Sequence, residues 1–303
     1  MLATFGALAP VFLLIALGWG LRRLGFPGDA FWPGAERLVY WVLFPALLVL
    51  NTAAADLAGV RLGPTAAALI AAISAMAALV LLVRPWLGLN GAAFTSVFQA
   101  SIRCNVYVGL AAAGELCGGD GLAVMGLIAA VVVPTVNVYC VVVLLRFAGV
   151  RAGTGTLVGA VATNPLILAC ATGFGLNLLG LPLPEIAASM LDILGRSSLA
   201  LGVLCVGAAL DFERLRRGLG AILLGAALKL LLLPAIALAS LWAFGIGGRV
   251  AEMAVLFTAL PIAPSGYVLA RQLGGDAPLI AGMITFTTLA AVVTVPVVVA
   301  VLG

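Results

Sequence analysis

The stretch G-W-G-L-R-R-L-G-F-P at residues 18–27 returns in the second half of the chain as G-F-G-L-N-L-L-G-L-P at residues 173–182. Both stretches fit G-x-G-L-x-x-L-G-x-P, and they are 155 residues apart in a chain of 303 residues. The same offset relates three further pairs, which are Pro10 and Pro165, Asp56 and Asp211, and Arg61 and Arg216. The chain is therefore predicted to consist of two copies of one unit, residues 1–150 and residues 151–303.

The composition indicates that this unit is embedded in a membrane. Hydrophobic residues make up 64% of the chain and charged residues 9%, with a mean hydropathy of +1.28. Soluble domains carry about 25% charged residues. The net charge of +4 comes from basic residues spread over short loops, which is typical of membrane topology signals and not of nucleic-acid binding. Duplicated membrane halves are typical of secondary transporters, whose binding site lies between the halves.

Ten segments are long and apolar enough to be membrane spans. Numbered in chain order, spans 1 to 10 are residues 4–22, 36–55, 64–83, 92–115, 121–146, 156–180, 186–210, 218–245, 250–272 and 277–302. Because each half holds five spans, the second copy enters the membrane upside down, which makes the repeat inverted. The odd-numbered loops hold ten arginines and the even-numbered loops two. The positive-inside rule then places both termini on the outer side.

Span 9 contains A-L-P-I-A-P-S-G-Y at residues 259–267, where a continuous helix is not expected. Pro261 and Pro264 each remove a backbone donor and clash with the preceding turn, and Gly266 lowers helix propensity further. Non-helical backbone at membrane depth is tolerated where it lines a cavity or is buried in protein. The interrupted helix ends would point free backbone groups and helix dipoles at a ligand. A simple proline kink is the alternative.

Span 4 is the corresponding element of the first half, and it is rich in polar residues without containing proline. Its polar side chains are Gln99, Ser101, Arg103, Asn105 and Tyr107. Gly109 follows them and is the predicted point of interruption. Polar groups this dense inside a span are costly unless they face a cavity or partners. A substrate-facing surface is favoured over a hydrogen-bonded network between packed helices.

Other polar residues inside the spans leave two interpretations open. Lys229 is the only lysine of the chain, and it either neutralises a substrate carboxylate or ties two helices together. Asn51 and Asn137 either reach the central cavity or hydrogen-bond between helices. Asp192 and Arg196 are four residues apart in span 7 and are predicted to form a structural ion pair.

Several segments of the chain resemble sequences of the auxin efflux carrier family, in particular bacterial relatives of the plant PIN carriers. The segments are A-P-V-F-L-L-I-A-L-G-W at 9–19, L-V-Y-W-V-L-F-P-A-L-L at 38–48, N-P-L-I-L-A at 164–169, K-L-L-L-L-P at 229–234 and P-I-A-P-S-G-Y-V-L-A-R-Q-L-G-G-D at 261–276. The last is the most specific. In span 4 the family favours N-x-x-x-G-L-P, which Asn105 and Gly109 match, whereas Ala111 replaces the proline.

The resemblance implies an all-α integral membrane protein of ten helices, with the elevator fold of sodium/proton antiporters and bile-acid symporters. Spans 4 and 9 would be broken and cross each other. Spans 1, 2, 6 and 7 would form a scaffold, and spans 3–5 and 8–10 a transport domain. Family members are often dimers and carry small organic anions such as auxin, malate or malonate. Asn105 and the Pro261–Ser265 segment would flank the substrate.

The predicted function is a carrier of small organic anions in a bacterial inner membrane, and we expect that the protein is not an enzyme.

 Nothing in the sequence forms a metal motif, a nucleophile–base pair or a carboxylate dyad, so we expect no catalysis, no metal and no cofactor. A sodium-coupled bile-acid-type symporter is the closest alternative, but no Asp or Glu lies deep in spans 4, 5, 9 or 10. A membrane sensor that does not transport is a further alternative, and proton coupling stays open.

The residues predicted to bind substrate lie in spans 4, 8 and 9. They are Arg103, Asn105, Tyr107, Lys229, Pro261, Pro264 and Ser265. The residues predicted to line the cavity without a specified contact are Asn51, Gln99, Gly109 and Asn137. The residues predicted to interrupt the helices are Gly109, Pro261, Pro264 and Gly266.

Overall fold

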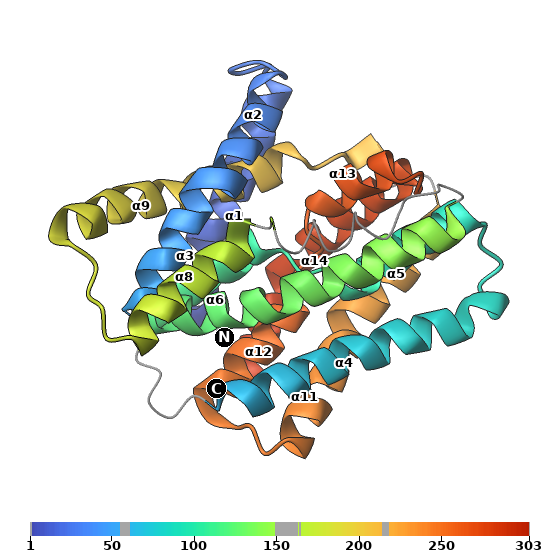
Figure 1. The fold of residues 1–303 in the computed structure, drawn as a ribbon. Helices are drawn as coiled ribbons and strands as arrows, with labels where there is room; N and C mark the ends of the chain where they lie inside the picture. Colours follow the sequence, from blue (N-terminus) through green and yellow to red (C-terminus); the bar gives the residue numbers. More distant parts are fainter. Residues whose placement is uncertain (1, 55–60, 149–162, 164, 214–217, 303) are drawn as a thin grey trace.

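A computed structural model of the chain describes residues 2–54, 61–148, 163, 165–213 and 218–302, and these residues form helices and no strand. The first half contains α1 (Leu2–Arg23), α2 (Phe31–Leu38), α3 (Phe44–Ala53), α4 (Leu62–Val83), α5 (Gly91–Ile102) and α6 (Val106–Phe147). The second half contains α8 (Pro165–Leu178), α9 (Glu185–Ala208), α10 (Leu219–Ala227), α11 (Leu233–Ala243), α12 (Gly248–Ala259), α13 (Ser265–Gln272) and α14 (Ala277–Leu302). Figure 1 shows their arrangement.

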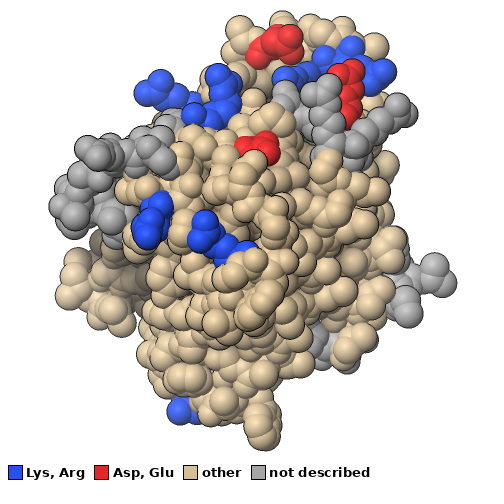
Figure 2. Space-filling model, turned by 90° about the vertical axis from the view of Figure 1, so that its right-hand side faces the viewer, with Lys and Arg blue, Asp and Glu red and all other residues tan. Residues whose placement is uncertain are grey.

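Helix length and composition identify a multi-pass membrane protein. Within the described residues, six helical stretches are long and apolar enough to cross a membrane. They are Phe31–Ala53, Leu62–Trp86, Gly91–Phe147, Glu185–Ala208, Leu219–Ala243 and Ala277–Val301. Large apolar side chains are exposed along these helices, and Figure 2 shows a wide uncharged band below the charged upper part of one face. Such an exposed apolar surface is suited to lipid.

Within the described residues, the ten spans expected from the sequence correspond to only six long apolar helical stretches. Spans 4 and 5 belong to one stretch, Gly91–Phe147, in which a non-helical Gly118 divides α6. Span 9 is divided into two short helices, α12 and α13. The interruptions themselves therefore account for part of the difference between six stretches and ten expected spans.

The helices form two packed groups. In the first group α1 packs on α9, and α3 packs on both α8 and α9. In the second group α4, α5, α6 and α10–α14 pack on one another. In Figure 1 the first group lies at the upper left, whereas α4, α5 and α11 lie at the lower right, with α6 running between them. We call the first group, which comprises α1, α2, α3, α8 and α9 with the turn between α2 and α3, the α1–α9 group. We call the second group, which comprises α4–α6 and α10–α14, the α4–α14 group.

The two copies of the repeated sequence end in the same backbone cap. In α1 the N–H of Gly25 bonds to the carbonyl of Arg22, and in α8 the N–H of Gly180 bonds to that of Asn177. Gly25 has a φ of 74° and Gly180 a φ of 63°, the left-handed conformation that favours glycine at a helix C-terminus. The motif has the same spacing in both halves because each copy forms the same helix end.

A side-chain contact is also repeated at the offset of 155 residues. The guanidinium of Arg22 donates to the carbonyl oxygen of Ala208. The amide of Asn177 donates to the carbonyl oxygen of Ala53 at 2.8 Å. Different side chains therefore tie the end of each repeated helix to the last turn of the corresponding partner, α9 or α3.

The first glycine of each G-x-G motif lies where two helices approach closely. A Cβ added to Gly18 would lie 2.8 Å from the carbonyl carbon of Leu204, and one added to Gly173 would lie 2.8 Å from the carbonyl oxygen of Val49. Leu204 and Val49 are themselves 155 residues apart. Close helix packing is the reason for these glycines, as expected for small residues in membrane helices.

Two helices widen into a π-turn just before a proline. The π-turn Val39–Leu43 (η1) precedes Pro45, and the π-turn Leu228–Leu232 (η4) precedes Pro234. Proline lacks a backbone donor and clashes with the carbonyl four residues earlier, and a π-turn relieves both problems. The second residue of each turn is polar and lies inside the protein: Tyr40 in η1 and Lys229 in η4.

Both expected interruptions are present, but one lies at a different residue. The chain leaves the helix between α5 and α6 at Arg103–Asn105, and between α12 and α13 at residues 260–264. Gly109 was predicted to interrupt span 4, and this prediction is wrong because Gly109 lies inside α6. A Cβ at Gly109 would lie 2.5 Å from Cδ1 of Leu260, so this glycine allows close packing on the other interruption. Gly266 is likewise helical, in the first turn of α13.

Candidate functional site

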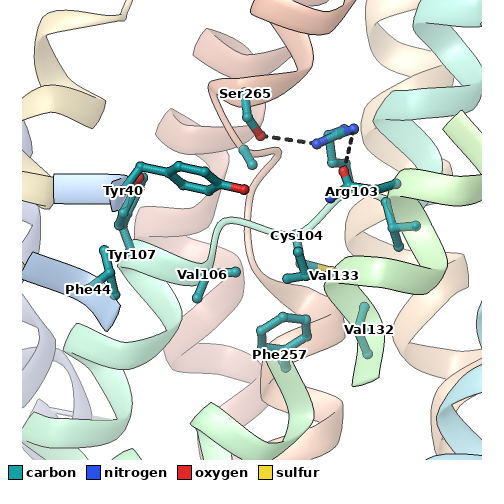
Figure 3. A pocket seen from close by; sticks show the side chains of 13 residues that line it. Tyr40, Phe44, Arg103, Cys104, Val106, Tyr107, Val132, Val133, Phe257 and Ser265 are labelled. Atoms are coloured by element: carbon teal, nitrogen blue, oxygen red, sulfur yellow. Dashed lines mark hydrogen bonds between the residues drawn. The ribbon is translucent and has the colours of Figure 1, made fainter. Parts of the chain in front are cut away.

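A cavity lies where the two interrupted segments meet the α1–α9 group. Its volume is about 130 Å³, measured as the space that the centre of a water molecule can reach. A single water needs roughly 10–15 Å³ on that measure, so the cavity accommodates several waters or a small organic molecule. The lining residues are Tyr40, Phe44, Arg103, Cys104, Val106, Tyr107, Val132, Val133, Val136, Asn137, Phe257, Ala263 and Ser265. Figure 3 shows these side chains around the open space.

Arg103 is the cation of this cavity. It lies in the interruption between α5 and α6, and only 6% of its surface is exposed. Its Nη1 donates to Oγ of Ser265 at 3.1 Å, and its Nη2 donates to Oδ1 of Asn137 at 3.0 Å. Both acceptors are neutral, and within the described residues no ion pair joins Arg103 to a carboxylate. The cavity therefore has a positively charged wall.

Two helix N-termini reinforce the positive potential at Arg103. The helix α6 begins at Val106 and α13 begins at Ser265, and both residues line the cavity. Figure 3 shows Ser265 and Arg103 facing each other across the bond that joins them. Because the N-terminus of a helix carries a partial positive charge, all three features favour a negatively charged ligand.

The backbone groups released by the interruptions find partners within the protein. The N–H of Asn105 donates to the carbonyl oxygen of Pro261 at 2.9 Å, which joins the two interrupted segments directly. The N–H of Ile262 donates to Oγ1 of Thr287 at 3.2 Å. Such compensation is what allows irregular backbone at membrane depth. The crossing is therefore a built structure and not a simple kink.

Asn105 acts at this crossing as a helix cap. Its side-chain oxygen accepts from the N–H groups of Tyr107 and Val108 at 3.1 and 3.3 Å, which is the bonding of an N-cap residue. Its side chain is fully buried and does not line the cavity, and its Nδ2 has no hydrogen-bond partner among the described residues. Asn105 thus positions the start of α6 beside the cavity.

Lys229 lies behind the cavity and not in its wall. It is completely buried, and its Nζ donates to the carbonyl oxygen of Thr258 and to Sγ of Cys104 at 3.3 Å. Thr258 lies in the last turn of α12, where helix carbonyls lack partners within the helix and the dipole is negative. Of the two interpretations left open by the sequence, these contacts correspond to the tie between helices.

We expect Lys229→Ala to weaken the fold more than substrate affinity. The change leaves a void and removes the donor to Thr258, at a cost of about 2–4 kcal/mol in unfolding free energy. The Michaelis constant (KM) for transport should change by less than about twofold, because the ammonium group does not line the cavity. Thermal unfolding in detergent and flux in liposomes would measure the two quantities. A tenfold rise in KM with unchanged thermal stability would instead place Lys229 in contact with substrate.

Of the predicted site residues, the structure brings four together at the cavity. They are Arg103, Tyr107, Asn137 and Ser265. Pro261 contributes its carbonyl oxygen to the crossing, and Pro264 lies in the wall of a neighbouring cavity. Gln99 is fully buried, and Asn51 donates to the carbonyl oxygen of Leu47 within α3. Neither of these two side chains lines the cavity.

The ion pair predicted in span 7 is present. Arg196 donates through Nε to Oδ1 of Asp192 at 3.0 Å, and its Nη2 lies 2.8 Å from Oδ2. The side chain of Arg196 is 80% exposed, which places the pair away from the cavity. An exposed pair of this kind contributes little to stability.

Sequence reasoning missed the aromatic residues of the cavity wall, which come from both helix groups. Tyr40 and Phe44 come from η1 and α3, and Phe257 comes from α12. Figure 3 shows the ring of Tyr40 extending into the cavity with its hydroxyl toward the centre. The signal that could have identified Tyr40 is a polar residue five positions before Pro45, where the helix widens. Phe44 and Phe257 carry no such signal, because apolar residues are common in every span.

A second, larger cavity of about 390 Å³ lies beside the first. It is bounded by α1, α2 and α9 on one side and by α13 and α14 on the other, and Pro264 connects it in sequence to Ser265 of the first cavity. Its wall contains Arg22, Glu36 and Arg271 among other residues. We call it the vestibule. It separates the two helix groups on the side where the arginine-rich odd-numbered loops lie.

Comparisons with known proteins agree with the resemblance seen in the sequence. Residues 154–299 match the sequence profile of a family described as membrane transport protein. The chain is also similar to a protein described as an uncharacterized transporter from Methanothermobacter thermautotrophicus. The two are 26% identical over 291 residues, which covers 94% of each chain. The matched region covers most of the second half, including α12, α13 and their interruption.

Proposed function

We propose that this chain, whose residues 154–299 match the membrane transport protein profile and which is similar over most of its length to an uncharacterized transporter, is a carrier of small organic anions. The single observation that carries the choice of an anion is Arg103. A buried guanidinium without a carboxylate partner among the described residues is costly in a membrane protein unless a ligand supplies the negative charge.

The chemistry of the cavity favours a carboxylate with an apolar body. The guanidinium can bind both oxygens of a carboxylate through parallel hydrogen bonds. The apolar part of the wall includes Phe44, Phe257 and four valines, with the hydroxyl of Tyr40 as a further polar group. A ligand with one charged end and an apolar or aromatic remainder can bind the guanidinium and contact the apolar side chains at the same time. The aromatic monocarboxylates and the short dicarboxylates are both tested below.

We propose that the α4–α14 group moves against the α1–α9 group as an elevator, exposing the cavity to each side in turn. Three features support this proposal. The cavity wall is shared between the groups, since Tyr40 and Phe44 come from one and Arg103 and Ser265 from the other. The contacts of Gly18 and Gly173 are equivalent, as an inverted repeat requires. The vestibule lies between the groups on the side of the arginine-rich loops, which we assign to the cytoplasm.

The proposed location is the inner membrane, with both termini outside and the chain as a homodimer. The arginine bias of the odd-numbered loops supports this orientation. The exposed apolar residues of α9, such as Ile186, Met190 and Ile193, provide a surface for a second copy or for lipid. Crosslinking of purified protein in lipid would distinguish a dimer from a monomer.

Flux through the purified protein tests the proposed function. The protein is reconstituted in liposomes, and currents or labelled flux are measured with indole acetate, malate and malonate, in sodium-free and in high-sodium buffer. We expect saturable, protein-dependent transport of at least one carboxylate, without a requirement for sodium. Liposomes that contain no protein correct for passive permeation of protonated acid. Absence of flux for all three carboxylates would contradict the carrier, and flux that requires sodium would indicate a cation site at the crossing.

A further inference from the structure

The uncompensated charge of Arg103 has a consequence for the transport cycle. We propose that the protein is an anion exchanger. After the site releases one carboxylate, it returns across the membrane with a second carboxylate bound, and not empty. This inference rests on the proposed function and names the mode in which that same site works. It arises from the charge of the site with and without its ligand.

The charge of the cavity changes by one unit when a monocarboxylate binds. In the empty state the guanidinium of Arg103 has only neutral acceptors, Ser265 and Asn137, among the described residues. The N-termini of α6 and α13 lie on the same wall and add to the positive potential. A bound carboxylate neutralises the guanidinium. The loaded cavity is therefore closer to electrical neutrality than the empty one.

Moving the empty site through the membrane is consequently the slow step. Arg103 lies on the segment that joins α5 and α6, so it travels with the α4–α14 group in the proposed elevator movement. An unpaired guanidinium at the membrane centre carries a penalty that corresponds to a factor of roughly 100 in rate. Water that enters the empty cavity lowers this penalty without removing it. Exchange avoids the step, because the site is occupied in both directions.

Lys229 does not alter this comparison. Its ammonium group contacts Thr258 and Cys104 within the protein and does not line the cavity. Its charge is therefore the same in the loaded and the empty protein. The difference between the two states is determined by Arg103 and the ligand.

The test compares exchange with net efflux in the same liposomes. Liposomes are loaded with the labelled carboxylate that gives flux in the first assay, chosen among indole acetate, malate and malonate. They are diluted into buffer that contains either the same unlabelled carboxylate or gluconate as the only other organic anion. We expect efflux of label to be at least about tenfold faster with the unlabelled carboxylate outside. Exchange of equal charges should also be insensitive to a potassium potential set with valinomycin.

Two variants with the same chemical change make the test specific. Arg103→Gln removes the charge but keeps a donor and an acceptor, so the ratio of exchange to net efflux should fall toward one. Arg196→Gln removes a charge from the exposed pair and should leave the ratio unchanged. Equal rates of exchange and net efflux in the unaltered protein would overturn the exchanger and leave the carrier intact. Flux in neither mode would overturn the carrier itself.

Discussion

Arg103→Gln should lower the transport efficiency, kcat/KM, by roughly 30-fold to 4,000-fold, which is the largest functional effect that we expect. The guanidinium is the cation that lines the cavity, and removing one partner of a buried charge pair costs about 2–5 kcal/mol. Each 1.4 kcal/mol corresponds to about a factor of ten, so this cost corresponds to roughly 30-fold to 4,000-fold. Most of the loss should appear as a higher KM, since the charge binds the carboxylate in the ground state.

The control for this variant is Arg196→Gln, which removes a guanidinium that is exposed and far from the cavity. Its kcat/KM should remain within about twofold of the parent, as expected for a surface pair. Initial rates of labelled carboxylate uptake into liposomes, corrected for the amount of folded protein, measure both variants. Parental kcat/KM in folded Arg103→Gln would show that the carboxylate is bound elsewhere.

Gly18→Val should cause the largest loss of stability. The space beside Gly18 is occupied by the backbone of Leu204, which cannot move aside as a flexible side chain would. The added side chain must push α1 away from α9, at a cost of about 3 kcal/mol or more. For a domain of this size, such a cost corresponds to a fall of roughly 5–10 °C in the temperature of thermal unfolding.

The same motif provides the matched control. Gly20 is the second glycine of G-W-G, and a Cβ added there meets no atom within 4 Å. Gly20→Val should therefore change stability by no more than about 0.5 kcal/mol. The second copy of the motif provides an independent pair of variants. A Cβ added to Gly173 would clash with neighbouring atoms, whereas one added to Gly175 meets no atom within 4 Å. Size-exclusion chromatography of heated samples in detergent measures all four variants. Equal melting of the Gly18 and Gly20 variants would contradict the packing.

The amino-acid sequence alone determined the broad outline of this protein. Its apolar composition excluded a soluble fold, because only lipid accommodates so much apolar surface. Pro261 and Pro264 located the interruption between α12 and α13, since proline acts on the backbone of its own neighbourhood. The repeat at an offset of 155 residues was visible in the motif, and its equivalent helix ends are present in the structure.

The position of the other interruption required the tertiary structure. Without a proline, α5 ends at Ile102, and the N–H of Asn105 bonds to the carbonyl oxygen of Pro261 on a distant segment. No local pattern encodes a hydrogen bond between residues 156 positions apart. Gly109 was therefore assigned to an interruption, whereas its absent side chain makes room for Leu260.

The tertiary structure also decided which polar residues share the cavity. From the sequence, Arg103, Asn105 and Lys229 were all predicted to bind substrate. Packing turns Arg103 into the cavity, Asn105 onto the N-terminus of α6, and Lys229 onto the end of α12. The physical reason is that spacing along a helix defines a face, whereas the neighbour that covers that face comes from another part of the chain.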